Sequence, residues 1–278
     1  MLASLGDLLE DVVVRIDDPV NVATDTDAHI TRRRGGSAAN VAAAAARSGH
    51  PSRFLGQVGE DAIGAALIDD LAADGVDVSF VRRGGRTGTI AVLVDATGER
   101  TMLTDRGACT DLDRPEPAWL DGVTTLHVPM YSLVGEPLGT TSTTAIGWAH
   151  DRGIDVSIDV SSVALIAAHG RVAVLASLQR LGPQVVFANA DEAGALDITS
   201  GIAGAVTVIK RGAAPAIVFA ASDRHEVPAT PLAEVGDTTG AGDAFAAGFL
   251  TARWRDDVVS AVQAAHRVAR TVIGNGRS

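Results

Sequence analysis

The sequence predicts an α/β protein in which a central, mostly parallel sheet is flanked by helices. Four short runs in the second half of the chain are β-branched and almost wholly apolar, as strands buried on both faces of a sheet must be. They lie at 126–128, 156–158, 185–188 and 206–209. Helical segments near 139–152 and 171–181 separate three of them. This alternation predicts parallel strands joined by crossover helices.

Length and composition fit a single domain of this class. The chain has 278 residues, of which 46% are hydrophobic and only 4% aromatic, so its core must consist mainly of Ala, Val, Leu and Ile. The 30 glycines suit a fold with many tight connections between strands and helices. We therefore expect one domain over residues 1–278.

Charge and hydropathy exclude several classes of protein. A net charge of −11 argues against a nucleic-acid partner, because phosphate backbones need a basic footprint. No apolar run reaches membrane-spanning length, and the N-terminus lacks the pattern of a signal peptide. The single cysteine, Cys109, excludes an internal disulfide and fits a reducing compartment. We expect a cytoplasmic protein with neither nucleic acid nor membrane as a partner.

The first hundred residues have patterns typical of strands and helices, with turn residues at their ends. Strands are predicted at 2–5, 12–16 and 52–58, and helices at 37–47 and 62–73. The polar, loosely alternating residues before Arg34 are typical of an edge sheet, and Gly75 marks the end of the second helix. Runs at 87–94 and 100–104, joined by a turn at 95–99, predict a hairpin. Arg106, which follows it, is a candidate for contact with an anionic substituent of a substrate.

A glycine-rich loop at 236–242 leads into a helix predicted at 244–254. Gly240 and Gly242 let the backbone approach an anion without a Cβ in the way, and a helix N-terminus offers free N–H groups. Asp243 is out of place there, since its carboxylate would repel a phosphate. It has a use if it accepts a proton from an attacking hydroxyl. The alternative interpretation is an ordinary acid in the first turn of a helix.

Two motifs carry a resemblance to a known family. The stretch from Asp237 to Asp243, followed by Ala-Phe, resembles the C-terminal signature of the ribokinase family of carbohydrate kinases. The run from Gly35 to Asn40, Gly-Gly-Ser-Ala-Ala-Asn, resembles that family's first motif. The resemblance implies a ribokinase-like fold with a small β-sheet lid over the sugar, drawn from about 12–34 and 87–104. In the family this lid is often also the interface of a homodimer.

The resemblance also implies ATP-dependent phosphorylation of a sugar hydroxyl. Asp243 would be the general base, and the backbone amides of Gly240, Ala241 and Gly242 would stabilise the transferred phosphoryl group. The family holds its sugar with residues that match Asp11, Gly36 and Asn40. Glu10 and Asp7 compete with Asp11 for the first of these roles.

The nucleotide and metal sites follow from the same resemblance. Asn189-Ala190-Asp191-Glu192 resembles an Asn-x-x-Glu motif that holds Mg²⁺ and its waters, and both polar ends of the motif follow a buried strand. Lys210, Gly212 and Thr238 match nucleotide-contacting positions, although Pro215 replaces the second glycine that relatives have. Asp237 and Thr239 are candidate ligands for K⁺, and residues 265–275 are expected to border the adenine.

Two other functions remain open. A nucleoside or vitamin kinase of the same fold is the first, although nucleoside sites usually use stacked aromatic rings and this region offers little beyond Phe80 and Tyr131. The second is a sugar-binding relative without catalysis. Asp243 and its glycines argue against it, because a protein that only binds sugar has no use for a base.

Overall fold

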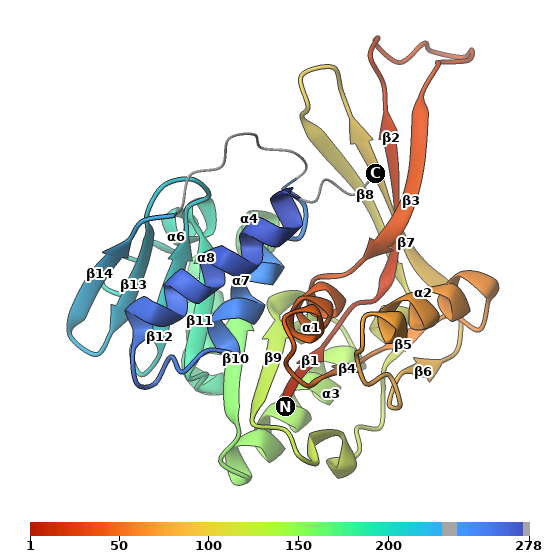
Figure 1. Ribbon diagram of the computed structural model, residues 1–278. Coiled ribbons are helices and arrows are strands. Elements are labelled where there is room, and N and C mark those ends of the chain that lie inside the picture. Colours follow the sequence, from red (N-terminus) through yellow and green to blue (C-terminus); the bar gives the residue numbers. More distant parts are fainter. Residues whose placement is uncertain (230–237, 275–278) are drawn as a thin grey trace.

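The computed structural model describes residues 1–229 and 238–274, and its centre is a large sheet (Figure 1). The strand order is β14-β13-β12-β11-β10-β9-β1-β4. All neighbours from β4 to β12 pair in parallel, whereas β13 and β14 form an antiparallel hairpin at one edge. The bounds are β1 (Leu2–Leu5), β4 (Ser52–Leu55), β9 (Thr125–Pro129), β10 (Asp155–Asp159), β11 (Val185–Asn189), β12 (Val206–Lys210), β13 (Ala216–Ala220) and β14 (Asp223–Val227).

Helices cover both faces of this sheet. On one face lie α1 (Ser37–Arg47), α7 (Ala241–Leu250) and α8 (Val258–Gly274), which pack on the sheet through an apolar cluster that includes Phe187 and Phe249. The other face is covered by α3 (Leu138–Asp151), α4 (Val163–His169), α5 (Arg171–Leu181) and α6 (Ala190–Leu196). At the β4 end, α2 (Ala62–Ala73) packs with α1. Short 3₁₀ turns are η1 (Ala108–Asp111), η2 (Pro117–Leu120) and η3 (Met130–Leu133).

A second, four-stranded sheet projects from the large one at the upper right of Figure 1. Its order is β3-β2-β7-β8, with bounds β2 (Leu9–Arg15), β3 (His29–Gly35), β7 (Thr87–Val94) and β8 (Arg100–Gly107). Asp11 and Arg100 share one face, since paired residues and residues two apart on a strand point the same way. Arg100 Nη1 donates to Thr239 Oγ1 at 2.7 Å. The face that carries Asp11 therefore turns toward the loop before α7.

The predicted fold class is confirmed, and several elements have the predicted bounds. The helices at 37–47, 62–73 and 171–181 and the hairpin strand at 87–94 are as expected. The strand predicted at 52–58 is instead two, because β5 (Gln57–Val58) leaves the large sheet to pair with β6 (Arg82–Arg83). The helix predicted at 244–254 begins earlier and ends at Leu250. No helix in the described part of the chain is long and apolar enough to cross a membrane.

Candidate active site

The glycine-rich loop ends where α7 begins, with Gly240 as the N-cap in the left-handed region (φ 78°). The N–H of Ala241 donates to the carbonyl of Thr238 at 3.1 Å. By contrast, the N–H groups of Gly240, Gly242 and Asp243 have no acceptor among the residues that the structure describes. Free amides at the positive end of a helix dipole are suited to bind an anion. Asp237 lies outside the described residues.

Asp243 is held by the start of α1, more than 200 positions earlier in the chain. Ser37 Oγ donates to Asp243 Oδ1 at 2.7 Å, and Asn40 Nδ2 donates to Oδ2 at 2.9 Å. Burial raises the pKa of Asp243 to about 6, against the opposing effect of these two hydrogen bonds. The carboxyl is therefore largely ionised at neutral pH, yet basic enough to take a proton. This arrangement joins the two sequence motifs.

An ion pair faces this carboxylate across the ends of the neighbouring strands. Lys210, the last residue of β12, donates from Nζ to Asp159 Oδ2 at 2.5 Å, and Asp159 is the last residue of β10. The side chains of Lys210 and Asp159 are 14% and 5% exposed. Asp159 was not among the predicted site residues. Its position directly after a buried strand is the same signal that marked Asn189.

Asn189 and Glu192 form a capping box at the start of α6. The backbone N–H and the Nδ2 of Asn189 donate to the two carboxylate oxygens of Glu192, and Glu192 N–H donates to Asn189 Oδ1, all at 2.8 Å. Burial, and then the charge of Asp159, raise the pKa of Glu192. The pair is thus a helix cap, and each carboxylate oxygen keeps a lone pair for a second contact.

The oxygen groups at this end of the cavity suit Mg²⁺. The acidic side chains of Asp159, Glu192 and Asp243 all act electrostatically on the ammonium of Lys210, while Arg211 and Arg270 also line the cavity. Within 1–229 and 238–274, no three His, Cys, Asp or Glu side chains form a metal cage. Mg²⁺ in nucleotide sites needs only one or two protein carboxylates, because it keeps several waters and takes phosphate oxygens as ligands. Asn189 and Glu192 fit as residues that hold the waters of such an ion.

One cavity of about 720 Å³ brings most of the predicted residues together. The predicted residues that line it are Asn189, Glu192, Lys210, Gly212, Thr238, Ala241, Gly242 and Asp243. Ser37, Tyr131 and Asp159 line it too, without having been predicted as site residues. His266, Ala269, Arg270 and Ile273 of α8 form part of its wall, in the region expected to border the adenine. The cavity therefore runs from the Asp243 carboxylate to α8.

The other predicted residues lie beside this cavity. Asn40, Thr239 and Gly240 line a small adjoining crevice of about 40 Å³. Asp11, on β2, lies against Gly35 and 3.6 Å from Arg33 Nε, and it is 8% exposed. Gly36, the N-cap of α1, packs against the backbone of Asp7. Thr239 accepts a hydrogen bond from Arg100, as described above, and a K⁺ site at Asp237 and Thr239 stays a prediction.

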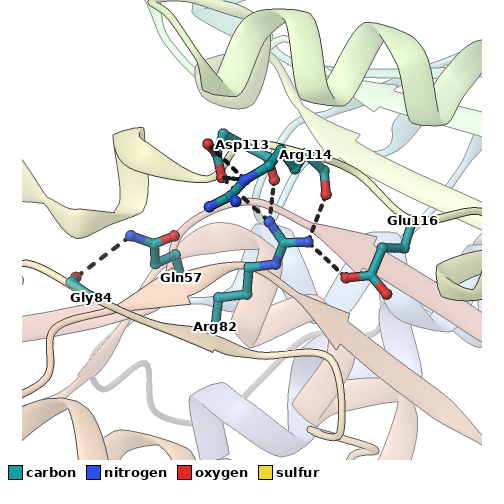
Figure 2. Close-up of polar contacts among 6 residues, drawn as sticks. All are labelled: Gln57, Arg82, Gly84, Asp113, Arg114 and Glu116. Carbon is teal, nitrogen blue, oxygen red and sulfur yellow. Dashed lines mark hydrogen bonds and ion pairs between the residues drawn. The ribbon is translucent and has the colours of Figure 1, made fainter.

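A second hollow, of about 780 Å³, lies near β5 and β6, with charged residues on its walls. Figure 2 shows its central group, the guanidinium of Arg82. It donates to the carbonyl oxygens of Asp113 and Arg114 and, at 2.8 Å, to the carboxylate of Glu116. These bonds satisfy the charge of Arg82 within the chain. The group connects the segment after η1 to β6 and needs no ligand.

Comparison with known proteins identifies the family. Residues 1–277 match the sequence profile described as pfkB family carbohydrate kinase. A fructokinase of Klebsiella pneumoniae is 33% identical over 254 residues, which cover 84% of this chain and 81% of that protein. An ATP-dependent ribose-1-phosphate kinase of Halopiger xanaduensis is 31% identical, over 91% of this chain and 84% of that protein.

Solved structures share the fold across the whole chain. The adenosine kinase from Sinorhizobium meliloti has a TM-score of 0.86 at 24% identity, with 98% of this chain and 93% of that chain covered. A putative ribokinase II from E. coli, in complex with ATP and Mg²⁺, has a TM-score of 0.83 at 22% identity, with 100% and 95% covered. The expected ribokinase-like fold is confirmed. The chain belongs to the PfkB family of carbohydrate kinases and is a phosphotransferase whose acceptor is an alcohol group.

Proposed function

We propose that this protein transfers the γ-phosphoryl group of ATP to a hydroxyl of a sugar, with Asp243 as the general base. The observation that carries the proposal is the placement of Asp243. Its carboxylate lies in the first turn of α7, next to free backbone amides, and is oriented by Ser37 and Asn40. A base and an anion-binding site are thus adjacent in one cavity, as phosphoryl transfer to a hydroxyl requires.

The residues of the cavity have different roles in this reaction. Asp243 takes the proton of the attacking hydroxyl as the new bond to phosphorus forms. The N–H groups of Gly240 and Gly242 stabilise the negative charge on the transferred group, and Thr238 and Gly212 border the nucleotide. Asn189 and Glu192 would hold the waters of Mg²⁺, which would supply positive charge that neutralises the phosphates. The sugar lies between α1 and the small sheet, against Asp11, Gly36 and Asn40.

We further propose that the sugar is neutral. Arg106, the candidate for contact with an anionic substituent, donates from Nε and Nη2 to the carboxylate of Asp7 at 2.8 and 2.7 Å. The two side chains are 18% and 12% exposed, so the charge of Arg106 is compensated in a largely buried pair. A phosphorylated sugar would have to compete with Asp7 for that charge. The Halopiger relative is named for ribose-1-phosphate, which makes phosphorylated sugars an informative contrast.

A substrate screen tests the proposal. Purified protein is incubated with ATP and Mg²⁺ and with fructose, ribose, their phosphates, adenosine or a vitamin alcohol, while ADP release is followed. We expect turnover with a free sugar. Turnover with adenosine alone would favour the nucleoside-kinase alternative, for which Tyr131 in the cavity wall offers an aromatic ring. Binding of sugar without ADP release would favour the non-catalytic relative.

The substitution Asn40→Ala is expected to weaken use of the sugar by about 1–3 kcal/mol in kcat/KM, the cost of leaving buried polar partners unpaired. The affinity for ATP should barely change. Loss of the hydrogen bond to Asp243 should also raise the pKa of that carboxyl. Ser37→Ala is the matched control, since it removes the other bond to Asp243 without removing the amide. An unchanged KM and turnover for sugar in Asn40→Ala would exclude Asn40 from the site.

Closure of the small sheet over the sugar is expected to slow amide exchange in 87–104 when the substrate is added. The contact of Arg100 with Thr239 supports a role of the sheet at the site, because it joins the sheet to the loop before α7. A closed lid would exclude water and so prevent hydrolysis of ATP. Hydrogen-exchange mass spectrometry measures the effect, with the distant β13–β14 hairpin as an internal control. Protection restricted to 237–243 would contradict a lid.

The outer face of the small sheet is expected to form a homodimer. On the side away from Asp11 it carries a row of apolar residues, of which Ile30 and Leu103 are each 58% exposed. Burial of such a patch stabilises association. Light scattering should therefore give twice the chain mass of 28.4 kDa, and Leu103→Glu should give the monomer. A monomeric wild-type protein at micromolar concentration would contradict this interface.

A further inference from the structure

Lys210 is the only lysine in a chain with 23 basic residues. Arginine occurs at every other basic position, on the surface and in ion pairs alike. The exception lies in the wall of the active-site cavity. An ammonium is a compact point charge that needs less room than a guanidinium. This choice of residue suggests that the site needs one small cation at this place.

The ammonium of Lys210 is oriented by the carboxylate of Asp159. One of its three donors is used by Asp159 Oδ2, as described above, and it makes no other hydrogen bond within the described part of the chain. The ring centroid of Phe187 is 5.8 Å from Nζ. Asp159 is itself oriented, because Ser161 N–H donates to its Oδ1 at 3.2 Å. Two donors of Lys210 therefore remain for a ligand.

These donors lie at the anion-binding end of α7. A Cβ placed on Gly242 would be 3.4 Å from Lys210 Nζ, so the ammonium is in van der Waals reach of the first helical turn. Burial alone would lower the pKa of Lys210, but Asp159, Glu192 and Asp243 raise it, and the ammonium stays charged. The charged ammonium of Lys210, with two donors not used by Asp159, and the free amides of Gly242 and Asp243 thus lie at the same end of the cavity.

We propose that Lys210 is a catalytic residue that contacts the phosphoryl group in transit, and that Asp159 is its positioning residue. This inference depends on the proposed function. As the sugar oxygen bonds to the γ-phosphorus, the bond to the β,γ-bridging oxygen breaks, and ADP leaves with the electron pair. The hydroxyl proton goes to Asp243. Lys210 keeps its protons and offsets the charge on the transferred oxygens.

The single lysine makes a direct test available. Protein grown with lysine labelled with ¹³C at Cε gives one side-chain signal, which needs no assignment by mutation. With Mg²⁺ present, ADP should leave that signal almost unmoved, whereas a non-hydrolysable ATP analogue should shift it. Equal shifts with both nucleotides would place Lys210 at the α- and β-phosphates and overturn the proposal. The proposal would also be overturned if the signal did not shift at all while calorimetry shows that the analogue is bound.

Variants test the catalytic part. Lys210→Met should lower kcat by about 10²–10³-fold, as the loss of one transition-state donor does, with an unchanged Kd for ADP. Asp159→Asn should lower kcat by at least about tenfold in the wild-type background and have little effect in Lys210→Met, because it acts through that residue. Arg171→Met, which breaks the exposed pair with Asp197, is the control for loss of an ion pair.

The outcomes separate this inference from the proposed function. If the wild-type protein phosphorylates no sugar in the screen, the proposed function fails, but the lysine signal still reports the contact with the γ-phosphate. If sugar turnover is normal and Lys210→Met retains it, the catalytic role of Lys210 is wrong while the kinase assignment stands. Additive losses from Asp159→Asn and Lys210→Met would show that Asp159 does not act through Lys210.

Discussion

Asp243→Asn is expected to lower turnover by at least about a hundredfold, with folding and ligand binding within a few-fold of wild type. A sugar hydroxyl is a poor nucleophile at neutral pH, and nearby phosphates repel an alkoxide that forms early. A base that takes the proton during bond formation typically contributes about 10²–10⁴-fold. Asn keeps the shape of Asp243 but cannot take the proton. The measurement is kcat together with the Kd values for sugar and nucleotide.

The pH dependence of kcat in the wild-type protein is a second test of Asp243 as the base. Because burial raises the pKa of Asp243 to about 6, the carboxylate is ionised at pH 7.5 and increasingly protonated below pH 6. A base must be ionised to work, so kcat should fall about tenfold per pH unit on the acid side of that value. In Asp243→Asn this limb should disappear from the residual activity.

Asp191→Asn is the matched control for Asp243, because Asp191 is also an acid in the first turn of a helix, but it is exposed. It should leave kcat unchanged. Near wild-type turnover in Asp243→Asn would show that Asp243 is only a helix-start acid. The hydrogen bonds from Ser37 and Asn40 would then serve to join α1 to α7 and no more.

The sequence predicted best those elements that carry their own end signals. The helix at 62–73 is bounded by Asp61, which caps it by accepting from Gly64 N–H at 2.8 Å, and by Gly75, which follows its end. The β13–β14 hairpin was missed. Its second strand, Asp223–Val227, is mostly polar and exposed, so it lacks the apolar pattern of the central strands.

The site was predicted by motif rather than by contact. Asn40 was expected to bind sugar, and in the structure it also donates a hydrogen bond to Asp243. The two residues are 203 positions apart in the sequence, so the sequence gives no sign of this contact. Ser37 was not predicted as a site residue, although it lies in the same motif, for the same reason. The pairing of Asp159 with Lys210 depends on the order of strands in the sheet, in which β11 lies between β10 and β12. Only the fold brings these strand ends together.

Gly36→Ala is expected to be the most damaging substitution outside the catalytic groups. Gly36 has φ 102°, which an L side chain rarely adopts, and a Cβ there would lie 2.1 Å from the carbonyl oxygen of Asp7. The colliding atoms are backbone, so no side chain can move aside. Strain of about 1–3 kcal/mol plus the clash should lower the free energy of unfolding by more than about 4 kcal/mol.

The same substitution should also reduce activity in the molecules that stay folded. Gly36 begins α1, and a shift of that end moves Ser37 and Asn40 away from Asp243. A displacement of about 1 Å can cost about 10²-fold in rate. Gly49→Ala is the matched control: Gly49 follows α1 with φ 82° but has open space around it, so only about 1–2 kcal/mol of backbone strain is expected, with kcat unchanged. Chemical denaturation measures the loss of stability, and kcat measures the loss of activity. If both variants lost the same amount of stability and activity, the contact with Asp7 would be irrelevant. Backbone conformation alone would then explain the need for glycine at position 36.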